Sequence, residues 1–150
     1  MKNKVKILMG IPGSGKSFTA NKLAPDSCIV SADKYWYNCV GDYLFVPKKI
    51  ASAHAWCFTE FERLLKEGKS IIVVDNTNIR KSHREAYIKK AEEFDYECEI
   101  VLPDSPWFTR ILPRLRDQTF TDADVHIFFE KNSHDVPFEV IKNMMKNWEE

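Results

Sequence analysis

Residues 10–17 read Gly10-Ile11-Pro12-Gly13-Ser14-Gly15-Lys16-Ser17 and match the pattern GxxxxGK[ST]. The chain has five glycines, and three of them fall within this short segment, so their clustering needs a local cause. Residues 5–9 before it form an apolar run of strand length, and residues 16–23 after it place apolar side chains along one helical face. The predicted order is therefore strand, glycine loop and helix, which is the context in which this pattern binds phosphate.

The chemistry of this loop follows from its residue types. Glycines let the backbone turn tightly and bring N–H groups against phosphate oxygens, while the start of the helix adds partial positive charge. Lys16 supplies a full charge for the β- and γ-phosphates, and the Ser17 hydroxyl can ligate Mg²⁺. The segment thus predicts a site for a nucleoside triphosphate, ATP with Mg²⁺; the alternative is a plain glycine turn with an exposed lysine. The residues predicted to bind the nucleotide here are Gly10, Pro12, Gly13, Ser14, Gly15, Lys16 and Ser17.

Strand-like and helix-like segments alternate as far as residue 102. The predicted strands are 5–9, 28–31, 70–75 and 97–102, and the predicted helices between them are 16–23, 47–66 and 81–94. Such alternation implies right-handed crossovers and a parallel sheet covered on both faces. We predict an α/β, three-layer P-loop NTPase fold in which the third strand lies beside the first, with strand order 2-3-1-4.

The pattern changes after residue 103. Three prolines between residues 103 and 113 break the chain, and short helical pieces follow at about 110–116 and 123–130. No strand signal returns. We predict a helical lid after Trp107, within a lid segment at about 104–136.

Composition limits the size and the partners. With 150 residues, 44% of them hydrophobic, the chain suits one compact domain over residues 1–150. The 22 Lys and Arg residues balance the 22 Asp and Glu residues, so no global positive field exists to attract nucleic acid. A nucleic-acid partner would therefore need a local basic groove.

The cysteines and the apolar runs bear on the cellular compartment. Cys28, Cys39, Cys57 and Cys98 form no CxxC pair, and nothing at the N-terminus resembles a signal peptide. We expect reduced thiols in a cytoplasmic protein. The longest apolar runs, such as residues 71–74, are far shorter than the ~20 residues that cross a bilayer, so we expect no membrane partner.

Two acidic residues stand at predicted strand ends. Asp33 follows the second strand, and Asp75 ends the third. Ligands of parallel α/β folds lie at the carboxyl ends of the strands, and a carboxylate beside the loop suits coordination of Mg²⁺, direct or through water. The alternative for Asp33 is a helix cap or turn aspartate, and for Asp75, with Asn76-Thr77-Asn78, a capping cluster.

Several short segments occur in a fixed order along nearly the whole chain. They are residues 10–17, Ser31-Ala32-Asp33-Lys34-Tyr35, Ala53-His54-Ala55-Trp56, Asp75-Asn76-Thr77-Asn78, Pro103-Asp104-Ser105-Pro106-Trp107 and Lys131-Asn132-Ser133-His134-Asp135-Val136-Pro137. Together they resemble the polynucleotide kinase-type P-loop kinases, which include the kinase domain of phage polynucleotide kinase and the NEDD4-binding-protein-2-like family. The DNTN, AHxW and PDxPW segments in combination are much more specific than the loop alone.

The resemblance implies roles for individual residues. Asp33 would be the general base that takes the proton from an acceptor hydroxyl, while Lys16 and Ser17 would hold the donor phosphates and Mg²⁺. The lid would close over the γ-phosphate with Lys131 as a catalytic cation. The family has an arginine there, and lysine offers a point charge where arginine offers a planar fork.

Other residues are weaker candidates. Arg110, Arg114 or Arg116 could compensate for the missing lid arginine, so Arg110 and Arg114 are predicted nucleotide ligands. Trp36 stands where the phage enzyme has a substrate-contacting arginine. Asn132 and His134 are predicted to approach the nucleotide, although a surface histidine is the alternative for His134.

Aromatic residues admit two interpretations. Tyr35, Trp36, Tyr37 and Tyr43 could stack on the bases of a single strand or pack over the core. His54 and Trp56, on a predicted helix, could face a substrate or pack inside the protein.

Three functions fit this sequence. The first is an ATP-dependent kinase that phosphorylates the 5′-OH of a single-stranded DNA or RNA end, and the second is a kinase of a nucleoside, nucleotide or sugar. The third is a nucleotide-dependent switch or binding module. Asp33 separates them, because a switch needs no base for a hydroxyl.

Overall fold

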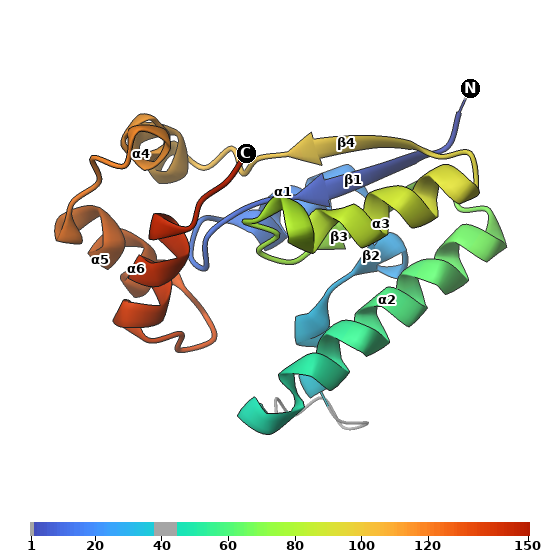
Figure 1. Ribbon diagram of the computed structural model, residues 1–150, viewed down its shortest axis with the longest axis horizontal. Coiled ribbons are helices and arrows are strands. Elements are labelled where there is room, and N and C mark those ends of the chain that lie inside the picture. Colours follow the sequence, from blue (N-terminus) through green and yellow to red (C-terminus); the bar gives the residue numbers. More distant parts are fainter. Residues whose placement is uncertain (1, 38–44) are drawn as a thin grey trace.

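The computed structural model describes residues 2–37 and 45–150, and a four-stranded parallel sheet lies at its centre (Figure 1). The strands are β1 (Lys4–Leu8), β2 (Ile29–Val30), β3 (Ile71–Asp75) and β4 (Glu97–Val101). Their order across the sheet is β2-β3-β1-β4. The α/β class, the strand order and the placing of the third strand beside the first are therefore confirmed.

The register brings the strand ends to one edge of the sheet. Leu8, at the end of β1, pairs with Asp75 on one side and with Val101 on the other. Just beyond, the backbone N–H of Met9 donates to the Val101 carbonyl at 3.0 Å. Because parallel strands point the same way, the glycine loop after β1 and the segment after β3 leave the sheet next to each other.

Helices cover both faces of this sheet, which gives three layers. They are α1 (Lys16–Leu23), α2 (Ile50–Glu67) and α3 (Lys81–Glu93). α2 and α3 pack against the face that carries Val5 and Ile72, whereas α1 packs against the opposite face, at Leu8 and Val73. The side chains of β2 and β3 are thus buried on both faces, as their continuous apolar runs predict, whereas no residue of the outer strand β4 is buried.

The long helix α2 begins after a short 3₁₀ turn, η3 (Pro47–Lys49), close to the predicted start at residue 47. Its buried residues recur at helical spacing, at Ala53, Cys57, Phe61 and Leu64. Gly68, with a φ of 72°, ends it in the left-handed region that favours glycine.

The chain after β4 folds into three helices that lie beyond the end of the sheet, to the left in Figure 1. They are α4 (Pro106–Asp117), α5 (Asp122–Lys131) and α6 (Phe138–Lys146), and we call α4, α5 and the loop that follows them to residue 137 the lid. Phe108, Ile111, Phe128 and Ile141 belong to an apolar cluster that the three helices share. The predicted helices in this part of the chain are therefore confirmed, with Trp107 in the first turn of α4, and their role as a lid stays a prediction.

Pro113 lies inside α4, so the prediction that the prolines break the chain there is wrong. Its ring removes the N–H that would bond to the Thr109 carbonyl. A proline inside a helix costs about 3 kcal/mol. The helix continues because Ile111 and Leu115 are fully buried, which stabilises it by about 1.5–3 kcal/mol for each side chain.

The second strand is shorter than predicted. Residues 28–31 give only Ile29–Val30 in β2, between the 3₁₀ turns η1 (Asp26–Cys28) and η2 (Ala32–Trp36). Ser31 caps η2, because its hydroxyl accepts a hydrogen bond from the N–H of Asp33, and this capping turn ends the strand.

Other expectations concern thiols and membranes. Cys28, Cys57 and Cys98 are free thiols, while Cys39 and Tyr43 lie outside the described residues. Within residues 2–37 and 45–150, no helix is both long enough and apolar enough to cross a membrane.

An ion pair between the half-exposed Arg114 and the buried Asp124 joins the first two lid helices. Arg114 Nε and Nη2 donate to the two carboxylate oxygens of Asp124, at 2.8 and 2.7 Å. The side chain of Asp124 is 7% exposed and also accepts from the backbone N–H of Thr121. The hydrogen bond from Arg114 is the main cause that holds the pKa of this carboxyl below its ordinary value.

We expect the Asp124→Asn variant to lower the Tm at neutral pH, because it removes the charge that Arg114 binds. A carboxyl whose pKa is depressed in the folded state stabilises the fold above its unfolded pKa of about 3.9, and loses that effect as the pH falls further. The gap in Tm between wild type and variant should therefore narrow below about pH 4. Thermal melts from pH 7 to pH 2.5 test this, with the exposed Asp117→Asn as control; a gap of constant size would contradict it.

Candidate functional site

The glycine loop lies at the sheet edge and is tied to β3 by its own backbone. The N–H of Gly10 donates to the carbonyl of Thr77 at 2.9 Å. Gly13 has a φ of 83°, and a Cβ at this position would lie 2.1 Å from the carbonyl oxygen of Phe128 in α5. Only glycine fits there, because the lid comes too close for any side chain.

Lys16, Ser17 and Asp75 come together at this edge. The Ser17 hydroxyl donates to Asp75 Oδ2 at 3.0 Å, and Lys16 Nζ lies 3.7 Å from Asp75 Oδ1. The prediction that β3 brings Asp75 to Ser17 is confirmed. Asp75 is buried, and its Oδ1 has no hydrogen-bond partner in the part of the chain that the structure describes.

This arrangement tests whether a divalent cation fits. No group of three or more His, Cys, Asp or Glu side chains that could hold a metal occurs among the described residues. Mg²⁺, however, keeps several waters and is usually bound through one or two protein oxygens plus substrate phosphates. A hydroxyl beside a buried carboxylate with an oxygen that accepts no hydrogen bond from the described residues suits that mode of binding.

The residues after Asp75 link three parts of the edge. Asn76 Oδ1 accepts from the backbone N–H of Ala32 at 2.8 Å, which ties η2 to the end of β3. Asn78 Nδ2 donates to the carbonyl of Leu8 at 2.7 Å. None of these side chains caps α3, whose N-cap is Arg80, so the capping alternative is wrong for Asn76 and Asn78.

Arg84 of α3 binds the backbone of the same segment, and no sequence pattern predicts this role. Its side chain is 4% exposed; Nη1 donates to the Asn78 carbonyl at 3.0 Å and Nη2 to the Glu149 carbonyl at 2.8 Å. Burial is the main cause that lowers the pKa of this guanidinium from its ordinary value. Because α3 has only a weak apolar face, its sequence pattern does not indicate that Arg84 is buried.

Asp33 does not cap η2, because Ser31 fills that role. The helix-cap half of the alternative is therefore wrong, whereas Asp33 does lie in a turn, the first turn of η2. Its side chain is 46% exposed, and Oδ2 lies 3.6 Å from His134 Nε2 of the lid. Beside it, Trp36 is buried and Tyr35 packs on Trp56, which favours the packing interpretation for these aromatics.

The lid binds the carbonyl side of the glycine loop. Trp107 Nε1 donates to the Gly13 carbonyl and the Ser105 hydroxyl to the Ser14 carbonyl, both at 2.8 Å. Lys131 Nζ lies 4.1 Å from the centre of the Trp107 ring, a cation–π distance. Both hydrogen bonds use carbonyl oxygens, so they do not compete with an anion for the N–H groups at the start of α1.

The side chains of the other lid residues considered as nucleotide ligands make no described contact with the glycine loop, and most of them bind other residues. Arg114 is bound to Asp124, and Arg116 to Glu150. Arg110 is exposed on α4, and in the described residues it makes no hydrogen bond or ion pair with the loop. Asn132 holds its own segment, because Nδ2 donates to the Phe129 carbonyl and Oδ1 accepts from the Val136 N–H.

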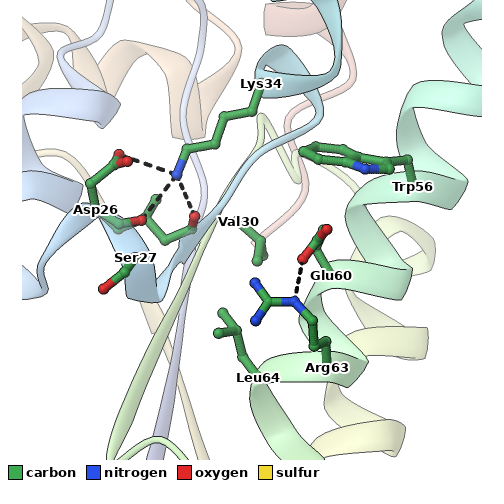
Figure 2. A pocket seen from close by; sticks show the side chains of 9 residues that line it. Asp26, Ser27, Val30, Lys34, Trp56, Glu60, Arg63 and Leu64 are labelled. Carbon is green, nitrogen blue, oxygen red and sulfur yellow. Dashed lines mark hydrogen bonds and ion pairs between the residues drawn. The ribbon is translucent and has the colours of Figure 1, made fainter. Parts of the chain in front are cut away.

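A pocket of about 250 Å³ lies beside β2, and Trp56 lines it (Figure 2). Lys34 Nζ donates to the Ile29 carbonyl at 2.6 Å and lies 3.1 Å from the Asp26 carboxylate. On the opposite wall Arg63 donates to Glu60 at 2.7 Å. The charges of this pocket compensate one another, and its lining contains none of the predicted nucleotide or catalytic residues.

Comparison with protein-family models matches residues 5–150 to the AAA domain. NEDD4-binding protein 2 of Homo sapiens is 34% identical over 104 residues, which are 67% of this chain and 6% of that protein. The putative bifunctional polynucleotide phosphatase/kinase of Acanthamoeba polyphaga mimivirus is 31% identical over 97 residues, which are 64% of this chain and 19% of that protein. The chain thus spans only a small part of the length of these relatives.

Solved structures share the fold at lower identity. A chain of the Pnkp1/Rnl/Hen1 RNA repair complex superposes with a TM-score of 0.63 at 20% identity, over 97% of this chain and 44% of that one. The gluconokinase of Sinorhizobium meliloti 1021 superposes with a TM-score of 0.53 at 12% identity, over 99% of this chain and 76% of that one. The fold is therefore that of P-loop kinases.

We expect Asn76→Ala to destabilise the protein by about 1–3 kcal/mol, since it leaves the buried N–H of Ala32 without an acceptor. Asn21→Ala, on the exposed face of α1, is the matched control and should change little. Urea unfolding followed by circular dichroism measures both. Equal stability of the two variants would show that Asn76 does not hold η2.

Proposed function

The chain belongs to the AAA domain family, as a polynucleotide kinase-like P-loop domain, and on that premise we propose that it transfers the γ-phosphate of ATP to the 5′-OH of a polynucleotide end. One observation carries the proposal. Two carboxylates follow the carboxyl ends of neighbouring strands and have different surroundings. Asp75 lies beside Lys16 and Ser17, whereas Asp33, on η2, caps no helix and is half exposed.

The first carboxylate belongs to the donor half of the site. Backbone N–H groups at the start of α1 and the ammonium of Lys16 would bind the β- and γ-phosphates. Ser17 and Asp75 would hold Mg²⁺, directly or through water. When bound, Mg²⁺ neutralises charge that develops on the phosphates. Lys16 would leave Asp75, 3.7 Å away, for the phosphates.

The second carboxylate belongs to the acceptor half. Asp33 would accept the proton of the hydroxyl as its oxygen forms a bond to the γ-phosphorus. The bond from that phosphorus to the β–γ bridging oxygen breaks, ADP leaves, and the proton on Asp33 passes to solvent. Exposure of this carboxylate favours the role, since an acceptor must reach it.

The lid would supply the remaining charge. Lys131, which lies over the Trp107 ring beside the glycine loop, is our candidate for the cation at the γ-phosphate. The other lid residues that the sequence predicts to approach the nucleotide are Asn132, His134, Arg110 and Arg114. Arg114 would have to leave Asp124 to take part.

The free thiols of the described cysteines support the expectation of a cytoplasmic protein.

A second acceptor class has its own support. The net charge of zero and the buried Trp36, where the phage enzyme has its substrate arginine, favour a small hydroxyl compound such as a sugar or nucleoside. The fold shared with a gluconokinase is compatible with it. A panel of 5′-OH oligonucleotides, nucleosides and gluconate, each incubated with labelled ATP, separates the two classes.

Lys16→Ala should weaken the binding of Mg·ATP at least tenfold, because the charge on the β- and γ-phosphates loses its partner, a change of about 1.4 kcal/mol or more. Isothermal titration with Mg·ATP measures the Kd. Lys66→Ala, an exposed lysine of α2, is the control and should bind as wild type does. Unchanged affinity of a folded Lys16→Ala protein would overturn the assignment of the loop.

Asp33→Asn should lower phosphoryl transfer by about 10²–10⁴-fold, the usual contribution of a positioned base. The affinity for Mg·ATP should stay near that of wild type, because Asp33 lies outside the donor half. Measuring both at two Mg²⁺ concentrations excludes a metal-binding role, which extra Mg²⁺ would rescue. Near-normal transfer by this variant would favour a binding module instead.

A further inference from the structure

One contact between the lid and the core of the protein joins His134 to Asp33. His134 Nε2 lies 3.6 Å from Asp33 Oδ2, although the two residues come from the loop after α5 and from η2. The sequence placed His134 near the nucleotide. In the structure its imidazole is directed instead at the carboxylate of the proposed base.

Local contacts restrain the loop that carries His134. Asn132 Oδ1 accepts from the Val136 N–H at 2.9 Å, so the loop closes on itself around His134. Asp135 has a φ of 53°, which turns the chain sharply, and Val136 packs against the apolar cluster of the lid. The position of the imidazole is therefore set by the lid.

The lid in turn is docked on the glycine loop. Gly13 meets the end of α5 at Phe128 and the side chain of Trp107, and Ser105 binds the Ser14 carbonyl. The segment of chain that packs on the glycine loop thus also carries His134 to Asp33. Movement of the lid away from the loop would separate both contacts together.

Asp33 needs such a partner if it acts as a base. Its backbone is fixed, through its own N–H to Ser31 and the N–H of Ala32 to Asn76, but its side chain is half exposed. A half-exposed carboxylate samples several rotamers, and only some aim an oxygen at the reacting hydroxyl. An N–H donor at Oδ2 restricts these rotamers and leaves Oδ1 for the proton of the acceptor.

We propose that His134 is a positioning residue that orients the Asp33 carboxylate when the lid is docked, so that the base is set only while the donor half is covered. This rests on the proposed function for the role of Asp33. An imidazole that carries its proton on Nε2 donates whether it is neutral or charged. At 3.6 Å the pair is an electrostatic contact, which bound nucleotide would shorten to a hydrogen bond as it draws the lid in.

The kinetic test is a double-mutant cycle. His134→Leu should lower kcat for phosphorylation of a 5′-OH oligonucleotide at least about tenfold, the effect of one hydrogen bond to a charged group, and leave the KM for ATP within about twofold. His134→Gln, which keeps an N–H donor near the place of Nε2, should recover most of the loss. In the Asp33→Asn background, His134→Leu should have no further effect. Equal losses in both backgrounds, or no advantage of Gln over Leu, would overturn the proposal.

A second readout does not depend on catalysis. Amide hydrogen exchange of residues 132–136 in the protein without nucleotide should speed up in His134→Leu and in Asp33→Asn, and the double variant should add nothing. Additive effects would overturn the contact. His126→Leu is the matched control, because this lid histidine pairs with Glu130 of its own helix and should change neither readout. A wild-type protein that phosphorylates no acceptor would refute the proposed function, and exchange would still decide whether His134 holds Asp33.

Discussion

The hydrogen bond from the Gly10 N–H to the Thr77 carbonyl joins the end of β1 to the end of β3, and the arrangement of the whole edge depends on that junction. On either side of Thr77, Asn78 binds the Leu8 carbonyl and Asn76 binds the N–H of Ala32. Two segments distant in sequence, the end of β1 with the glycine loop and the start of η2, are thereby held by the tetrapeptide at residues 75–78. Because buried amides cost free energy unless they are paired, this network fixes the loop, the end of β3 and η2 as a unit. The same network positions the backbones that carry the carboxylates of Asp33 and Asp75.

The lid completes this edge from the other side. It meets the glycine loop through carbonyl oxygens and through the space left by a missing Cβ, so it can lie close without occupying the donors that an anion would use. Its helices share an apolar cluster with α6, with Ile11 of the glycine loop and with Ile79 of the segment after β3. Movement of the lid would therefore break these apolar contacts as well as its polar contacts with the loop.

Sequence reasoning succeeded where a local pattern has a single physical cause. The glycine loop between a strand and a helix, the apolar runs and the helical spacing in residues 50–67 predicted the sheet order and most element bounds. It failed where long-range packing decides. Burial of Ile111 and Leu115 carries α4 through Pro113, and the amides of Asn76 and Asn78 serve strands rather than a helix cap. A pattern likewise cannot show that Arg114 faces Asp124 or that His134 faces Asp33, since both pairings depend on how the lid folds.

The ammonium of Lys34 has a consequence for the outer side of the sheet. β2 is an edge strand of two residues, and Lys34 Nζ occupies the carbonyl of Ile29 while Asp26 balances its charge (Figure 2). A strand from another molecule that added to this edge would have to displace a charged group from its acceptor and find little backbone to pair with. The sheet is thus closed to growth on the β2 side, which guards against aggregation through strand addition.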